Sequence, residues 1–230
     1  MDQTLPSFFG NFSIPRGILW VYANKCGSTF LENFFNKKGY KQLAIRDESS
    51  NELIDDPSIK ERYFIYRDPV DRFMAWYNVF VYRDKVDASN LKYNLTNDKL
   101  YSEAFLKLSF NKHPDLISSA YNFLSSYKDY ELYDLLQYDT HTVPLINYFK
   151  YTKGDPKKYR IVNITSLSHV IHDKFFEWHT GSFNKNAILS RDNIVLLQKI
   201  VEILQPLYSG DFEILYPETL KNNSTDKQEE

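Results

Sequence analysis

The alternation of apolar and polar residues predicts a strand, a short loop and a helix over residues 17–39. Residues 18–23 form an apolar run with almost no polar interruption, which is typical of a central parallel strand covered on both faces. After four polar or small residues, apolar side chains recur every three or four positions over residues 30–35, which indicates an amphipathic helix. Either Ser28 or Gly27 can serve as the N-cap of this helix.

A second unit of the same kind follows. Residues 62–66 predict another buried strand, with Arg67 at its carboxyl end, and the Asp-Pro pair at 68–69 suits the start of a helix. The helical spacing leaves Arg72 and Ala75 off the core face of that helix. The core face carries Val70, Phe73, Met74, Tyr77 and Val81.

The rest of the chain predicts further elements of both kinds. Additional strands are expected at residues 42–45 and 159–164, and a last short element at 212–216. Additional helices are expected at residues 99–109, 113–138, 166–178 and 192–207. Irregular structure is expected for an N-terminal arm at residues 1–16 and for a polar loop at residues 83–98.

These patterns predict a single α/β domain over residues 1–217, with a central parallel sheet flanked by helices, followed by a polar tail at 218–230. A chain of 230 residues leaves little room for a second full domain. With 43% hydrophobic and 25% charged residues, the composition is that of a globular protein.

The loop of the first unit favours anion binding, because free N–H groups and the helix dipole point at whatever sits before a helix. If the two strands are parallel neighbours, Lys25 and Arg67 both project at the carboxyl edge of the sheet. The loop is not a Walker loop, since its lysine precedes the glycine. It can still surround a phosphate or sulfate with the backbone N–H groups of residues 26–30, the hydroxyls of Ser28 and Thr29, and the Lys25 ammonium.

Composition and charge limit the kinds of molecule that the chain is expected to bind. A net charge of −2 and a pI near 6.2 argue against bulk binding of nucleic acid, so an anion site must be a local concentration of positive charge. Cys26 is the only cysteine, which excludes an internal disulfide, and the histidines form no metal-ligand set, so we expect no metal. No apolar run approaches the roughly 20 residues of a membrane span. Aromatic residues make up 17% of the chain and suit either core filling or stacking on a base or sugar.

Four segments occur in an order and spacing that extend over about residues 18–216. They are NKCGSTFLENFF at 24–35, YFIYRDPVDRFMAWY at 63–77, Asp139-x-His141-x-x-Pro144, and YSGDFEIL at 208–215. Together they resemble the PAPS-dependent sulfotransferase superfamily, in particular its carbohydrate (Golgi-type, family 2-like) branch and relatives in bacteria and viruses.

The resemblance implies a P-loop-like nucleotide site for the co-substrate PAPS, 3′-phosphoadenosine 5′-phosphosulfate. It assigns the 5′-phosphosulfate to the side chains of Lys25, Ser28 and Thr29 and to the backbone at Cys26, Gly27 and Phe30, and it assigns the 3′-phosphate to Arg67. The chain departs from the family at three positions. Asn24 replaces the usual proline, Ala75 replaces the serine that shares the 3′-phosphate with the arginine, and Leu145 replaces a frequent glutamine.

The function that follows is transfer of a sulfuryl group from PAPS to a hydroxyl acceptor, most simply on a carbohydrate or glycoconjugate, by in-line displacement without a metal. Lys25 would neutralise the leaving phosphate. His141 is the candidate base, because its reference pKa of about 6.5 suits the task, and Asp139 could fix its tautomer. Glu32 is a weaker candidate. Asp139 and His141 also fit an ordinary hydrogen-bonded structural pair.

Other functions remain open from the sequence. A kinase-like phosphotransferase would need a magnesium-binding carboxylate at a strand end, for which Asp68 is the one neat candidate. A non-catalytic nucleotide- or glycan-binding relative could have lost donor affinity through Ala75. A tyrosyl, lipid or polyanionic acceptor also stays open. Because the Golgi relatives carry a membrane anchor and this chain shows none, we expect a cytoplasmic location in a bacterial or viral setting.

Overall fold

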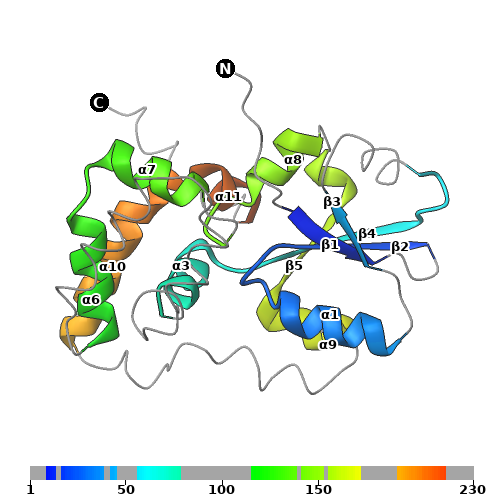
Figure 1. The fold of residues 1–230 in the computed structure, drawn as a ribbon, viewed down its shortest axis with the longest axis horizontal. Coiled ribbons are helices and arrows are strands. Elements are labelled where there is room, and N and C mark those ends of the chain that lie inside the picture. The colour runs from blue at the N-terminus through cyan, green and yellow to red at the C-terminus, as the bar shows by residue number, and fades with distance from the viewer. Residues whose placement is uncertain are drawn as a thin grey trace, which may run out of the picture.

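The computed structural model describes residues 9–13, 17–38, 42–45, 56–78, 115–138, 141–152, 155–171 and 191–215. They form an α/β fold in which helices flank a five-stranded sheet (Figure 1). The strands are β1 (Phe9–Ser13), β2 (Ile18–Tyr22), β3 (Gln42–Ile45), β4 (Glu61–Tyr66) and β5 (Arg160–Asn163). The helices are α1 (Ser28–Lys37), α3 (Pro69–Tyr77), α6 (Leu116–Ser125), α7 (Asp129–Tyr138), α8 (Ile146–Thr152), α9 (Leu167–Ile171), α10 (Arg191–Leu207) and α11 (Ser209–Leu215), with short 3-10 turns η2 (Pro156–Lys158) and η3 (Ile164–Ser166).

The sheet has the order β3-β1-β2-β4-β5. Strands β2, β4 and β5 run parallel, with Tyr22 opposite Ile65 and Ile65 opposite Val162, so the predicted parallel sheet is confirmed for these three strands. Strand β1 is antiparallel to both of its neighbours, β2 and β3. The carboxyl ends of β2, β4 and β5 therefore lie at one edge of the sheet, which is where ligands gather in open α/β folds.

The prediction of an irregular arm over residues 1–16 is wrong for Phe9–Ser13, which form β1. The sequence of β1, FGNFS, contains glycine, asparagine and serine, which are poor strand formers. Its strand conformation depends on ladder hydrogen bonds to β2 on one side and β3 on the other. Pairing with two neighbours thus overrides a weak local preference.

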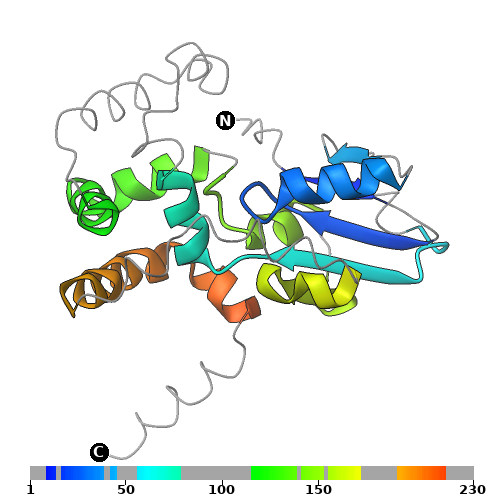
Figure 2. The same cartoon turned by 90° about the horizontal axis from the view of Figure 1, so that it is seen from below.

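Alternation along the strands divides the apolar side chains between two faces. On one face, Trp20 of β2 and Ile65 of β4 pack with Leu31 and Phe35 of α1 and with Leu167 of α9. The views of Figures 1 and 2 agree that α1 and α9 cover this face. The opposite face packs against α8 through a second cluster. That cluster includes Leu19, Val21, Phe64, Tyr66, Tyr148 and Phe149.

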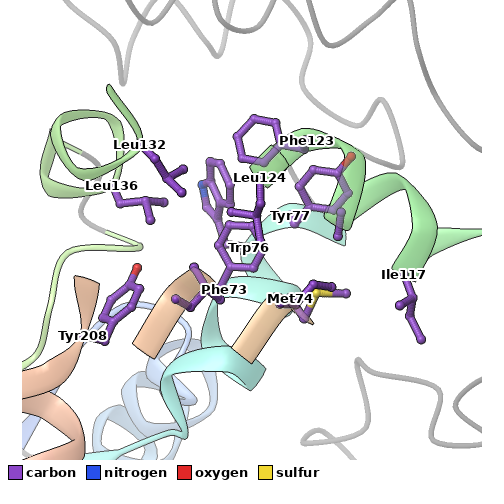
Figure 3. Packing of buried hydrophobic residues seen from close by; sticks show 13 residues of the cluster. Phe73, Met74, Trp76, Tyr77, Ile117, Phe123, Leu124, Leu132, Leu136 and Tyr208 are labelled. Atoms are coloured by element: carbon purple, nitrogen blue, oxygen red, sulfur yellow. The ribbon is translucent and has the colours of Figure 1, made fainter. Parts of the chain in front are cut away.

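A third cluster lies beyond the end of the sheet, among α3, α6, α7 and α10 (Figure 1). Figure 3 shows its centre, where the rings of Phe73, Trp76 and Tyr77 of α3 meet Phe123 of α6. Ring centroids lie 5.4 Å apart for Tyr77 and Phe123 and 5.6 Å apart for Phe73 and Trp76. For these rings, core filling is the role that the structure supports.

Helix α3 buries more of its surface than predicted. The side chains assigned off its core face, Arg72 and Ala75, are only 1% and 3% exposed. An arginine is almost never fully buried without partners, so helical spacing alone favoured the wrong side of the helix. The partners that bury Arg72 come from distant loops and are described below.

Other predicted elements differ mainly in extent. The helix expected over 113–138 is two helices, α6 and α7, which a turn at 126–128 separates. The helix at 192–207 is confirmed as α10, the strand at 42–45 as β3, and the last element belongs to α11. The segments at 83–98, 99–109 and 218–230 lie outside the described residues. Among the helices that are described, none is long and apolar enough to cross a membrane.

Candidate functional site

The turn between β2 and α1 uses two left-handed residues. Lys25 has a φ of 64° and Gly27 a φ of 78°, and the backbone N–H of Cys26 donates to the Ala23 carbonyl at 3.1 Å. Gly27 is the N-cap of α1, and no side chain caps this helix. Of the two residues that the sequence allowed as N-cap, the structure selects Gly27, which leaves the hydroxyl of Ser28 unused for capping.

The turn between β4 and α3 is built differently. Asp68 is the N-cap of α3, and its carboxylate accepts hydrogen bonds from the backbone N–H groups of Val70 at 3.0 Å and Asp71 at 3.2 Å. Pro69 occupies the first turn, where it needs no N–H partner. The predicted cap is confirmed, and the carboxylate is engaged by the backbone of its own helix.

The parallel pairing of β2 with β4 brings Lys25 and Arg67 together, as predicted from their places at the strand ends. The guanidinium of Arg67 donates to the backbone carbonyl of Lys25 at 3.4 Å, although 42 residues separate them. The two cationic residues thus lie at one edge of the sheet, on adjacent turns.

Arg67 is buried, with 7% of its surface exposed. A guanidinium carries five N–H donors, and a buried charge is costly unless it has hydrogen-bonding partners. Across the described part of the chain, the long bond to Lys25 is the one hydrogen bond that this side chain makes, and it has no carboxylate partner there. Among the described residues Arg67 therefore has no ion-pair partner, and most of its N–H donors have no acceptor there.

A second buried arginine holds the same turn. Arg72 donates from Nε to the carbonyl of Asn24 at 3.1 Å, next to the Lys25 carbonyl that Arg67 contacts. Two guanidinium groups thus fix two consecutive carbonyls and stabilise the left-handed conformation of Lys25, which costs on the order of 1–2 kcal/mol in a non-glycine residue. Asn24, where the resembled family has proline, contributes this backbone contact.

Arg72 also reaches the segment that begins at His141. Its second nitrogen donates to the carbonyl of Val143, and the hydroxyl of Tyr208 donates to the adjacent carbonyl of Thr142. His141 is half-buried at the start of this segment. Its predicted partner Asp139 lies outside the described residues. The contacts of Arg72 place residues 141–146 beside the turn that carries Lys25.

Asp211 fixes the other end of that segment. Its carboxylate accepts the backbone N–H groups of Leu145 at 2.8 Å and Ile146 at 2.7 Å, which caps the start of α8 from 65 residues away. Burial raises the pKa of Asp211 to about 6, while the two N–H bonds and the nearby Arg72 oppose that rise. Asp211 is 2% exposed, so the segment is held by two buried groups of opposite charge.

Cys26 is fully buried beneath the turn, where it packs in the cluster shared with Tyr66 and Val143. Burial raises the pKa of its thiol, and the positive charges of Arg72 and Arg67 only partly offset this effect. A thiol in this state is a packing group, not a nucleophile.

The remaining predicted residues are either exposed in α1 or buried in the core. Ser28, Thr29 and Glu32 lie in the first two turns of α1 with partly or fully exposed side chains. Phe30 stacks on Phe34 at 6.1 Å between ring centroids and packs towards the sheet, so only its backbone can face the turn. Ala75 is buried inside α3. Leu145 is buried too, and its backbone N–H serves Asp211.

The site contains three residues whose roles the sequence did not predict: Arg72, Tyr208 and Asp211. Tyr208 and Asp211 belong to a segment matched only through resemblance, and their spacing suggested no chemistry. Arg72 could have been found from its neighbours, because an arginine directly before Phe73 and Met74 lies among core positions. A cation in such a setting needs acceptors within the fold.

A metal site is not indicated by the residues that the structure describes, since none of their His, Cys, Asp and Glu side chains form a group of three or more that could hold an ion. Comparison of the chain with protein-family models, curated proteins and solved structures gave no match.

Proposed function

We propose that this chain is a PAPS-dependent sulfotransferase of the carbohydrate type, which transfers a sulfuryl group to a hydroxyl of a carbohydrate or glycoconjugate. The observation that carries the proposal is the buried Arg67 guanidinium, which makes one long hydrogen bond among the described residues, beside a helix start whose N-cap glycine supplies no side-chain cap. A nucleotide charged at both its 3′ and 5′ ends needs two such positive centres. The order of the four sequence segments supports the same assignment.

In this proposal the residues of the first turn bind the 5′ end of the nucleotide. The backbone N–H groups from Cys26 to Phe30, the hydroxyls of Ser28 and Thr29 and the Lys25 ammonium would surround it, and Arg67 would bind the 3′-phosphate. When bound, PAPS supplies an activated sulfuryl group whose S–O bond to the 5′-phosphate breaks as a new S–O bond to the acceptor forms. Lys25 stabilises the charge that develops on the leaving phosphate.

The acceptor hydroxyl must lose its proton during transfer. His141 is the proposed base, since Arg72 holds its segment beside the turn, and Asp139 is proposed to orient it. We further propose that the protein acts in the cytoplasm. Replacement of His141 by alanine should lower the transfer rate strongly while the affinity for PAP, the desulfonated nucleotide, stays unchanged.

The kinase-like alternative is weakened by one contact. Asp68, the carboxylate that such an enzyme would use for magnesium, accepts two backbone N–H groups as the cap of α3. The non-catalytic alternative keeps one supporting observation, which is that the buried Ala75 offers no hydroxyl to a phosphate. Calorimetry separates the three functions. Magnesium-independent binding of PAP favours a sulfotransferase, and binding of ATP with magnesium favours a kinase. The absence of nucleotide binding favours a non-catalytic relative.

The decisive test is transfer from labelled PAPS to a panel of sugar hydroxyl acceptors, detected by mass spectrometry. Lys25→Ala should abolish transfer while circular dichroism shows an intact fold. Lys37→Ala is the matched control, since Lys37 is an exposed lysine in the last turn of α1, the helix that follows Lys25, and should leave the rate unchanged. Full turnover by Lys25→Ala would refute the assignment.

A further inference from the structure

Arg72 is the most buried charged side chain among the described residues, with 1% of its surface exposed. It lies one turn into α3 and donates to two carbonyls that belong to different loops. One acceptor is Asn24, in the turn before α1, and the other is Val143, in the segment before α8. These acceptors lie 48 and 71 residues from Arg72 along the chain.

We propose that Arg72 is a positioning residue that couples the turn at 24–27 to the segment at 141–146. A nucleotide bound at the turn would then restrain the segment that carries His141. This inference rests on the proposed function and adds a role that neither the anion site nor the candidate base requires by itself.

The geometry favours arginine for this task. A guanidinium is planar and rigid, so two acceptors bonded to different nitrogens are held in a fixed relative position. Burial strengthens both bonds, because water does not compete for the donors. A lysine has a single donor group at the end of a flexible chain and cannot hold two carbonyls in one fixed arrangement.

The segment can respond as one body because its other contacts are also buried. Asp211 holds the backbone N–H groups of Leu145 and Ile146, and Tyr208 holds the carbonyl of Thr142. Both of these groups come from the C-terminal part of the chain. Among the contacts described, Arg72 alone bonds both loops through its side chain.

Amide hydrogen exchange of the intact chain, read by mass spectrometry with and without PAP, tests the coupling. In the wild-type protein, PAP should slow exchange at residues 24–31 and also at residues 142–149. In Arg72→Lys, the slowing should be confined to residues 24–31. Tyr208→Phe is the matched control, because it removes one bond to the same segment and leaves Arg72 in place. Its basal exchange at 142–149 should rise about tenfold, yet PAP should still slow both regions.

A kinetic measurement separates a positioning role of Arg72 from a general loss of structural stability. Arg72→Lys should bind PAP within about threefold of the wild-type affinity and lower kcat about tenfold or more, since the nucleotide contacts remain and the placement of His141 is lost. A purely structural role would raise the exchange of both loops without changing how they respond to PAP.

The outcomes are distinguishable from those of the proposed function. If PAP slows exchange nowhere in the wild-type protein, the proposed function fails. If PAP slows exchange only at residues 24–31 of the wild type, or at both regions of Arg72→Lys, the coupling is refuted and the proposed function stands. Should Arg72→Lys fail to fold, the wild-type response at residues 142–149 decides, supporting the coupling if present and refuting it if absent.

Discussion

Helices α1 and α3 begin at the same edge of the sheet, after neighbouring parallel strands, yet their first turns are completed in opposite ways. Helix α3 is capped by its own Asp68, which accepts two backbone N–H groups. Helix α1 begins at Gly27 in a left-handed conformation and has no side-chain cap. A helix start leaves several N–H groups without intrahelical partners, so a start that lacks a cap retains its capacity for an anion.

Helix α8 gives a third solution, because its cap comes from Asp211, which is 65 residues away from Ile146. Of the three helix starts, the one at α1 therefore differs in that its N-cap residue is a glycine, which provides no side-chain cap. The two buried arginines that contact the same turn add positive charge to it. The comparison of the helix starts supports a proposed anion site at the start of α1 and a structural role for the start of α3.

The most direct way to remove the difference between the two turns is to place a carboxylate at Gly27. Gly27→Asp places a carboxylate at the start of α1, and aspartate tolerates the left-handed conformation of this position better than most residues. A negative charge about 4 Å from a bound phosphate costs about 4 kcal/mol at an effective dielectric constant of about 20, which corresponds to roughly a thousandfold weaker PAP binding. Calorimetry should show this loss.

Gly27→Asn is the matched control for that experiment. It supplies a side chain of similar size without the charge, so PAP affinity should fall much less than in Gly27→Asp. If Gly27→Asp and the wild-type protein bound PAP with equal affinity, the anion would not bind at this turn.

The distant cap of α8 predicts a pH dependence of stability. Because the fold raises the pKa of Asp211 to about 6, from its usual value of 3.8, the folded state holds this proton more tightly than the unfolded chain does. The contribution of Asp211 to stability is therefore greatest below about pH 4 and is lost as the pH rises through 6. A pKa shift of about two units corresponds to about 3 kcal/mol in the free energy of unfolding.

Urea unfolding of wild-type protein and Asp211→Asn at several pH values measures this effect. The free energy of unfolding of the wild type, minus that of the variant, should fall by roughly 2 kcal/mol between pH 4 and pH 7. A difference that increases with pH would mean that the N–H bonds and Arg72 outweigh burial, and that Asp211 is a stabilising anion at neutral pH.

The local cap of α3 should matter for stability alone. Asp68→Ala removes the acceptor of two backbone N–H groups and should lower the free energy of unfolding by about 1 kcal/mol, or Tm by about 2–4 °C. Thermal unfolding followed by circular dichroism measures it. Magnesium-independent PAP binding should persist in this variant, whereas magnesium-dependent binding of ATP that is present in the wild type and lost in Asp68→Ala would revive the kinase-like function.

The smallest stability effect is expected at Ser28. Because its hydroxyl caps nothing in α1, Ser28→Ala should change the free energy of unfolding by less than about 0.5 kcal/mol. The proposed role in binding predicts a drop in PAP affinity all the same. A loss of stability as large as that of Asp68→Ala would show that the two helix starts are alike.

The sequence predicted those features of the fold and site that depend on local patterns. Long apolar runs identified β2 and β4, and the Asp-Pro pair identified the start of α3, since each signal is contained within a few residues. The parallel strands then brought Lys25 and Arg67 to one edge, as expected.

The parts that escaped prediction depend on contacts between distant residues. Strand β1 has a weak local preference and exists through pairing with two neighbours. Arg72 was placed off the core because helical spacing cannot reveal acceptors that lie 48 and 71 residues away. The cap that Asp211 provides was hidden for the same reason, since nothing in the spacing links residue 211 to the start of α8.

The position of Tyr208 and Asp211 in the chain has a consequence for synthesis. Chains emerge from the ribosome amino end first, so β2, β4 and the turns that follow them are made well before the residues that fix the segment at 142–146. The sheet and Arg72 are made early, whereas the bonds that Tyr208 and Asp211 add to the segment must wait until α11 is complete. A chain truncated before Tyr208 should therefore keep its strand pairing and lack an ordered candidate base. The candidate site around Lys25 and His141 would then be complete only after residues 208–211 have been synthesised.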